Sequence, residues 1–203
     1  MQKVVEDMLT KTQKCIKRIY DLIVVLVLLP VLVFPIFVLF LIATLSTKQN
    51  GFFAQRRVGQ HGKLFCCYKI RTLKGKNHGD VNAMKANETS FGKWLRKSKL
   101  DELPQLFNVL KGDMSFVGPR PDVPGYADKL DADNRIILTI KPGITGPATL
   151  KYKNEDELLL KQPNPQIYND TVIWPDKVAI NKEYIKNWSL WKDCTFLIAS
   201  VIR

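Results

Sequence analysis

The longest apolar pattern in the chain lies near its N-terminus. From Leu22 to Leu45 the sequence reads LIVVLVLLPVLVFPIFVLFLIATL, 24 residues without a charged side chain. At about 1.5 Å per residue, a helix of this length covers the hydrocarbon core of a bilayer. The run exceeds the apolar region of a signal peptide, and no small-residue cleavage site follows it. We therefore expect a membrane segment that stays attached to the chain.

Two features favour a re-entrant segment, which enters the membrane and returns to the same side. Lys and Arg, which favour the cytoplasmic side, flank the run at both ends. They are Lys11, Lys14, Lys17 and Arg18 before it, and Lys48, Arg56, Arg57 and Lys63 after it. Pro30 and Pro35 each remove a backbone donor, so we expect a helix–break–helix arrangement with the membrane break at Pro30. The alternative is a kinked helix that crosses once, because spanning helices tolerate proline.

After this segment, apolar clusters on either side of GQHG (59–62) predict two strands joined by a turn. In the second strand Lys69 and Arg71 are two residues apart, on one face, where they could grip a phosphate group together. A solvated basic strand face explains the pair equally well. The polar stretch from 75 to 87 predicts a loop, with His78 as a surface residue.

The next stretch, SFGKWLRKSKLDELPQLFNVLKG, has the apolar spacing of helices and ends at Gly112. Pro104 belongs in the first turn of a helix, so a second helix should start near Asp101 and Glu102. A positive helix N-terminus favours ionised carboxylates, which suits them to act as a nucleophile or metal ligands. Helix capping by Asp101, with Glu102 in the first turn, is the simpler interpretation.

Two rigid loops follow. GDMSFVGPRPDVPG surrounds Arg120 with proline and glycine, which fixes its guanidinium at low entropic cost, and this planar group suits phosphate oxygens. KPGITGPA, from Lys141 to Ala148, should pack near it, although its lysine could be purely structural. Further on, four residues share one helical face that suits either a membrane interface or a protein core. They are Ile180, Tyr184, Trp188 and Trp191.

The distribution of charged residues indicates what kind of partner the protein binds. The chain has 31 Lys and Arg against 19 Asp and Glu, a net charge of +12, and 46% of its residues are hydrophobic. Residues 48–99 hold 13 of the basic side chains but two acidic ones, Asp80 and Glu88. The composition excludes a disordered tail, and the local excess indicates an anionic partner. The four cysteines lack metal-ligand spacing and are expected to be reduced packing residues.

Four blocks in this order, after an apolar segment, closely resemble the bacterial sugar transferase family. They are QRRVG at Gln55, KIRTL at Lys69, LRKSKLDELPQLFNVLKGDMSFVGPRP at Leu95 and KPGITGPA at Lys141. The resemblance covers about residues 18–191. Members of this family are small monotopic phosphoglycosyl transferases that act on polyprenol phosphate.

The resemblance implies a reaction and a site. A sugar 1-phosphate would pass from a UDP-sugar to polyprenol (undecaprenyl) phosphate, giving polyprenol diphosphosugar and UMP. Asp101 would form a covalent aspartyl intermediate, Glu102 would deprotonate or position the acceptor, and both would bind Mg²⁺. The expected substrate-phosphate ligands are Arg120, Arg96, Lys69 and Arg71. Such a reaction opens the synthesis of capsule, O-antigen, exopolysaccharide or glycoprotein glycans.

Some positions depart from the family pattern. The membrane break commonly reads Ser-Pro, whereas Leu29 precedes Pro30 here, so no hydroxyl satisfies the freed carbonyls. The region after Ala148 lacks the aromatic, glutamine and arginine features of some subgroups, so the sequence does not identify the sugar. Two other functions are compatible with the sequence. One is direct transfer with Asp101 as general base, and the other is a non-catalytic, membrane-tethered basic module that binds anionic lipid or nucleic acid.

Together these patterns predict an α+β, mainly helical protein. Residues 1–47 would form a basic segment and the re-entrant membrane helix, and 48–203 a small cytosolic catalytic domain with a β-hairpin and interfacial amphipathic helices. We expect it at the cytoplasmic face of a bacterial inner membrane. The expected partners are the membrane, a UDP-sugar and polyprenol phosphate, with no nucleic acid. Homo-oligomerisation is left open.

Overall fold

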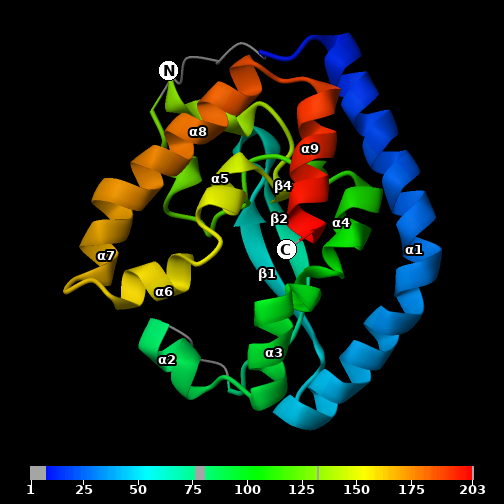
Figure 1. The fold of residues 1–203 in the computed structure, drawn as a ribbon, viewed down its shortest axis with the longest axis vertical. Helices are drawn as coiled ribbons and strands as arrows, with labels where there is room; N and C mark the ends of the chain where they lie inside the picture. Colours follow the sequence, from blue (N-terminus) through cyan, green and yellow to red (C-terminus); the bar gives the residue numbers. More distant parts are fainter. Residues whose placement is uncertain (1–7, 76–80, 132, 203) are drawn as a thin grey trace. The chain divides into compact units, whose positions relative to one another are not determined.

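The computed structural model describes residues 8–75, 81–131 and 133–202, and these form a mainly helical fold with short strands (Figure 1). The α-helices are α1 (Lys11–Thr47), α2 (Val81–Ala86), α3 (Ser90–Ser98), α4 (Gln105–Lys111), α5 (Pro147–Lys151), α6 (Glu155–Leu160), α7 (Pro165–Tyr168), α8 (Trp174–Lys186) and α9 (Leu190–Val201). The strands are β1 (Phe52–Val58), β2 (Leu64–Ile70), β3 (Ser115–Val117) and β4 (Gly143–Thr145). Short helical turns are η1 (Gln60–Gly62), η2 (Leu100–Glu102), η3 (Ala127–Lys129), η4 (Asn134–Leu138) and the π-helix η5 (Asn169–Ile173). This confirms the expected mainly helical class.

Helix α1 continues through both of its prolines. The expected helix break at Pro30 is therefore absent, because Pro30 and Pro35 remove two bonds from a ladder of 37 residues and leave the turns on either side intact. By length and composition α1 is the helix, among the residues described, that could cross a membrane. Core helices of soluble proteins are also apolar, but they are mostly buried. Of the most apolar 18-residue window of α1, 11% is buried.

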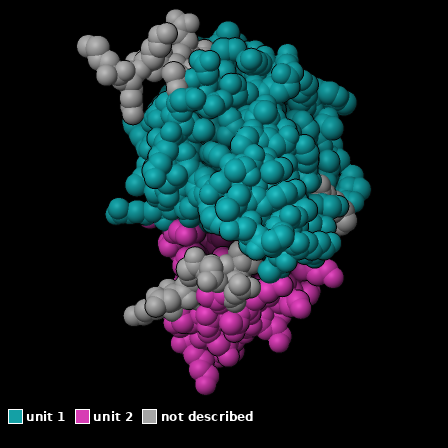
Figure 2. Space-filling view, turned by 90° about the vertical axis from the view of Figure 1, so that its left-hand side faces the viewer, with its two compact units in different colours: residues 1–21, 56–65, 112–203 teal, residues 22–55, 66–111 magenta. Residues whose placement is uncertain are grey.

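The chain divides into two compact units, coloured separately in Figure 2. Unit 1 contains residues 1–21, 56–65 and 112–203, and unit 2 contains residues 22–55 and 66–111. Both α1 and the hairpin of β1 and β2 contribute residues to each unit.

The expected hairpin is present, and β1 and β2 form a two-stranded sheet. His61 and Gly62 have positive φ angles of 57° and 78° in its turn, which reverses the chain. Cys66 is exposed and Cys67 buried, as alternation along a strand requires. The loop expected over 75–87 contains a short helix, α2, while residues 76–80, with His78, lie outside the described residues.

Helix α3 begins at a Thr89 cap, whose hydroxyl accepts a hydrogen bond from Gly92 N, and ends at Lys99, where φ is 58°. The chain then forms η2 before α4 starts at Gln105. Asp101 and Glu102 thus lie in a separate 3₁₀ turn, and not in the first turn of α4 as expected. Gly112, with φ of 89°, follows α4 as predicted.

In unit 1, β3 and β4 pair in parallel, with Ser115 opposite Gly143 and Val117 opposite Thr145. This confirms that the two rigid loops pack together. Gly118 N donates to Thr145 O, and a Cβ on Gly143 would lie 2.1 Å from Gly118 N, so the close approach requires glycine. Helix α9 packs on β3 and β4, and α8 packs on η4 and α5 (Figure 1).

The C-terminal apolar face is divided between two helices, because α8 ends at Lys186 and α9 begins at Leu190. Tyr184 is buried at 4% exposure, whereas Trp191 is 80% exposed. The prediction of one continuous face is therefore wrong. Tyr184 packs in the core, whereas the exposed apolar residues of α9 could contact a membrane interface.

Candidate active site

Unit 2 places two carboxylates, on consecutive residues, in a buried turn. Asp101 and Glu102 are 6% and 7% exposed. Backbone bonds of the i to i+3 type close the turn, from Glu102 N to Lys99 O and from Leu103 N to Leu100 O. Carboxylates are seldom buried to this extent, because burial removes the hydration of the charged form. The turn therefore has a structural cost that a role in chemistry would explain.

Lys69 of β2 contacts Glu102 of this pair directly. Its Nζ lies 3.1 Å from Glu102 Oε1, and the two side chains are 21% and 8% exposed. An ammonium group at this distance stabilises the ionised carboxylate. The structure thus brings Lys69 to the turn that carries both carboxylates, although Lys69 and Glu102 are 33 positions apart in the chain.

Asn108 of α4 explains how β2 is held at this position. Its Oδ1 accepts a hydrogen bond from Tyr68 N at 3.0 Å, and its Nδ2 donates to Cys66 O at 2.7 Å. Asn108 is fully buried, so these two bonds fix the register of β2 against α4. Sequence reasoning missed this residue. The signal was an amide inside the apolar run LFNVL, where a polar side chain needs a specific partner.

Arg71 does not share the contacts of Lys69. Its Nε donates to Asn50 O at 2.7 Å, and its guanidinium lies over the Phe53 ring at 5.3 Å from the centroid. It therefore supports the start of the hairpin. In the same unit Arg96 Nε lies 3.6 Å from Glu88 Oε1. Both arginines thus have protein contacts, and their binding of substrate phosphate stays a prediction.

Arg120 belongs to unit 1, in the loop after β3, where it is half-buried. Its positive charge favours the ionised form of the Asp122 carboxyl group. Burial raises the pKa of Asp122 to about 6, although the positive charges of Lys177, Arg57 and Arg120 oppose the rise. The loop is held in place by Val58 N, which donates to Asp122 O, and by Arg57 Nη1, which donates to Pro121 O.

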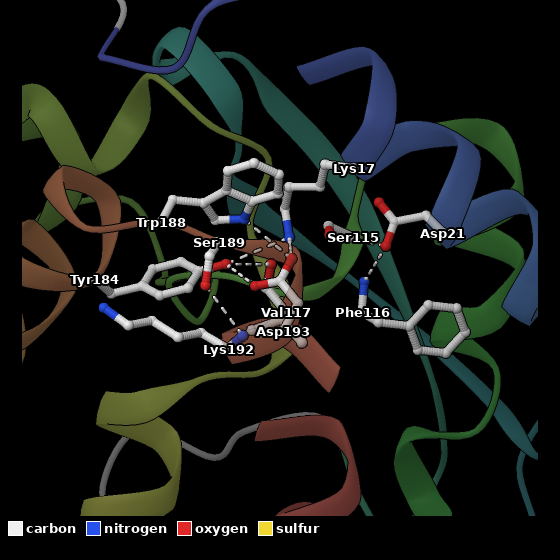
Figure 3. Close-up of polar contacts among 10 residues, drawn as sticks. All are labelled: Lys17, Asp21, Ser115, Phe116, Val117, Tyr184, Trp188, Ser189, Lys192 and Asp193. Carbon is white, nitrogen blue, oxygen red and sulfur yellow. Dashed lines mark hydrogen bonds and ion pairs between the residues drawn. The ribbon is translucent and has the colours of Figure 1, made fainter. Parts of the chain in front are cut away.

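A second buried polar cluster in unit 1 was not predicted (Figure 3). Asp193 of α9 is 0% exposed, and its Oδ2 lies 2.5 Å from Lys17 Nζ of α1. Tyr184 donates to Asp193 Oδ1 at 2.6 Å, and Trp188 Nε1 donates to Oδ2 at 3.1 Å. The aspartate raises the pKa of Tyr184 further, in addition to the larger effect of burial. This cluster joins the start of α1 to the C-terminal helices.

The carboxylate pair fits a magnesium ion shared with a substrate. Among residues 8–75, 81–131 and 133–202, no three His, Cys, Asp or Glu side chains form a group that could hold a metal alone. Mg²⁺ is usually held by one or two carboxylates together with substrate phosphates. Asp101 and Glu102 would supply two such carboxylates, and both are buried.

Comparison with known proteins places this chain in a family. The family model described as "Bacterial sugar transferase" matches residues 12–203. A Bacillus subtilis "Uncharacterized sugar transferase EpsL" is 34% identical over 190 residues, covering 92% of this chain and 85% of that protein. The "Undecaprenyl-phosphate galactose phosphotransferase" of Salmonella typhimurium is 29% identical over 214 residues, covering 96% of this chain.

A third relative is the "UDP-glucose:undecaprenyl-phosphate glucose-1-phosphate transferase" of Xanthomonas campestris. It is 34% identical over 167 residues, or 78% of this chain. The matched regions span 41% of the Salmonella protein and 32% of the Xanthomonas protein. With the family model matching almost the whole sequence, this chain belongs to the bacterial sugar transferase family.

Proposed function

We propose that this protein transfers a sugar 1-phosphate from a UDP-sugar to polyprenol (undecaprenyl) phosphate, giving polyprenol diphosphosugar and UMP. The observation that carries the proposal is the buried Asp101 and Glu102 pair with Lys69 against Glu102. The names of the Salmonella and Xanthomonas relatives, both undecaprenyl-phosphate sugar phosphotransferases, support the substrate class.

The transfer proceeds in two displacements. A carboxylate oxygen of Asp101 attacks the sugar-linked phosphorus, forming a new P–O bond while the bond to the bridging oxygen breaks and UMP leaves. A phosphate oxygen of the polyprenol phosphate then attacks the same phosphorus, and the Asp101 carboxylate leaves. Glu102 accepts the acceptor's proton or positions the acceptor, and Lys69 holds the Glu102 side chain for this task.

Cations must offset the charge that gathers when carboxylates approach a diphosphate. Asp101 and Glu102 would hold Mg²⁺, which when bound neutralises negative charge on phosphate oxygens. Arg120 is assigned to the substrate phosphates because its proline-rich loop limits its motion. Arg96 and Arg71 are retained as weaker candidates, since each would have to leave a contact within the protein to bind substrate.

The membrane assignment rests on α1. Its exposed apolar side chains include Val31 at 70% and Phe34 at 71%, which would contact lipid acyl chains. Basic residues flank the apolar run on both sides, so both ends are assigned to the cytoplasmic face of a bacterial inner membrane. Because the helix continues through Pro30 and Pro35, a re-entrant path requires a kink within the helix and no unwound segment. Residues 48–203 then work at the cytoplasmic surface, with the exposed apolar residues of α9 at the interface.

Single cysteines introduced before Asp21 and after Lys48 test this path. A cysteine-free background is needed because Cys15, Cys66 and Cys194 are at least partly accessible. Labelling of both sites from the cytoplasmic side supports the re-entrant path. Labelling of the two sites from opposite sides would establish a single crossing instead.

The reaction is tested by UMP release from a panel of UDP-sugars, with polyprenol phosphate and Mg²⁺, using detergent-solubilised protein. Wild type should release UMP with one sugar, and Asp101→Asn should abolish release while the melting temperature stays nearly unchanged. Rapid quenching should trap a phosphosugar on Asp101 of the wild type. Turnover without such an adduct would favour direct transfer, and no release from any sugar by a folded protein would reject the proposal.

A further inference from the structure

Unit 1 contains a cavity of about 280 Å³ that the proposed reaction does not use. One wall is a face of α1, and the other comes from the start of β3 and the loop before β4. Its polar lining residues include Lys14, Lys17, Arg18, Asp21, Gln60, Ser115 and Lys141. The residues from α1 recur at helical spacing, so their side chains share one face.

Two cations of this lining converge on one point. A Cβ on Gly112 would lie 3.2 Å from Lys141 Nζ and 3.5 Å from Arg18 Nη2. The two groups come from segments more than 120 residues apart, so the fold itself brings them together. Partial burial and the Arg18 charge both lower the pKa of Lys141. Like charges placed close together in a cavity carry a cost that a bound anion would relieve.

Two carboxylates, those of Asp21 and Asp113, lie near these cations. Asp21 and Asp113 both act on the Lys141 charge. Asp21 Oδ1, however, accepts hydrogen bonds from Ser115 Oγ and from Phe116 N, each at 3.0 Å (Figure 3). These bonds tie Asp21 to β3. Lys17, which also lines the cavity, is held by Asp193.

The position along α1 indicates what kind of anion would bind. Asp21 is the last residue before the apolar run that starts at Leu22, and Arg18 and Lys14 lie one and two turns earlier. Ile16 and Ile19, from the same turns, are 41% and 52% exposed. Basic side chains at the polar end of an apolar helix lie at the depth of lipid headgroups.

We infer that this cavity binds the phosphate of an anionic phospholipid, between Arg18 and Lys141, with the acyl chains along the exposed apolar side of α1. Such a lipid would hold the start of α1 at the membrane surface. The site is independent of the proposed transfer, since none of its residues has a role in that reaction.

Equilibrium binding of a fluorescent phosphatidylglycerol to the full chain in neutral detergent tests the inference. Lys141→Gln and Arg18→Gln, which change two separate elements, should each weaken binding about tenfold. Lys141→Arg should stay within about threefold of wild type, because it keeps the charge. Lys129→Gln removes the same charge from an exposed position in unit 1 and should leave binding unchanged. Size-exclusion chromatography and melting curves verify that each variant is folded.

Competition identifies the source of the phosphate. Unlabelled phosphatidylglycerol should displace the probe at concentrations at least tenfold lower than phosphatidylcholine, which is zwitterionic, or inorganic phosphate. Equal competition by inorganic phosphate would overturn the lipid assignment in favour of a free anion. Wild-type affinity in both Lys141→Gln and Arg18→Gln would overturn the site itself. Asp101→Asn should bind the probe normally, which separates this outcome from failure of the proposed reaction.

Discussion

Lys69 Nζ lies 3.1 Å from Glu102 Oε1, and this contact joins the β-hairpin to the turn that carries both buried carboxylates. The lysine is on β2 and the glutamate in η2, so the distance depends on how α4 holds the strand. The contact therefore links the stability of unit 2 to the proposed chemistry.

Replacing Lys69 by Met should lower UMP release about 100-fold, because a preorganised charge next to the reacting groups is lost. Initial rates with saturating UDP-sugar measure the effect. Lys97→Met, at an exposed position of α3, is the matched control and should stay within about twofold of wild type. Similar rates in the two variants would show that Lys69 has no part in catalysis.

Asn108→Ala should destabilise the protein by about 2 kcal/mol or more, because Tyr68 N and Cys66 O both lose a buried partner. Urea unfolding followed by circular dichroism gives the free energy. The exposed Asn154, whose side chain makes no capping bond, provides the control, and its alanine variant should change stability by less than about 0.5 kcal/mol. A small effect of Asn108→Ala would contradict its assignment as the residue that fixes β2.

For the buried ion pair of Lys17 and Asp193, removing one partner should cost more stability than removing both. Asp193→Asn leaves the Lys17 ammonium, whose side chain is 7% exposed, without its charged partner, and should cost about 3 to 5 kcal/mol. Lys17→Met together with Asp193→Leu should cost less, since no charge is then buried. The pair of Lys151 and Asp176 is more exposed, at 55% and 36%, so breaking it should cost less than about 1 kcal/mol. Equal losses at the two pairs would contradict this assignment.

Stability should depend on pH through Asp122. Burial raises its pKa from 3.8 to about 6, so between these values the folded state binds the proton more tightly than the unfolded state. The free energy of unfolding therefore falls as pH rises through this window, by at most about 3 kcal/mol for a shift of this size. Because Asp122 is half-buried, solvent should reduce the change. Asp122→Asn should flatten this part of the curve, measured by urea unfolding at pH 4 to 7, and an unchanged slope would reject the prediction.

Local patterns identified much of the fold and part of the site. Alternation and the GQHG turn predicted the hairpin, and Gly112 marked the end of α4, because both signals act within a few residues. The same locality explains two errors. One apolar face was predicted across 180–191, where the chain forms α8 and α9, and a break was expected at Pro30, where the helix continues.

The sequence by itself determined the long apolar segment, the hairpin, the adjacent carboxylates and the family blocks, since each is written in neighbouring residues. Only the tertiary structure brought Lys69 to Glu102, Asn108 to the β2 backbone, Lys17 to Asp193 and Lys141 to Arg18. These pairs of neighbours join residues from 33 to 176 positions apart. A buried polar group gains its partner only when packing removes it from water, and a linear pattern does not encode which distant segment then faces it.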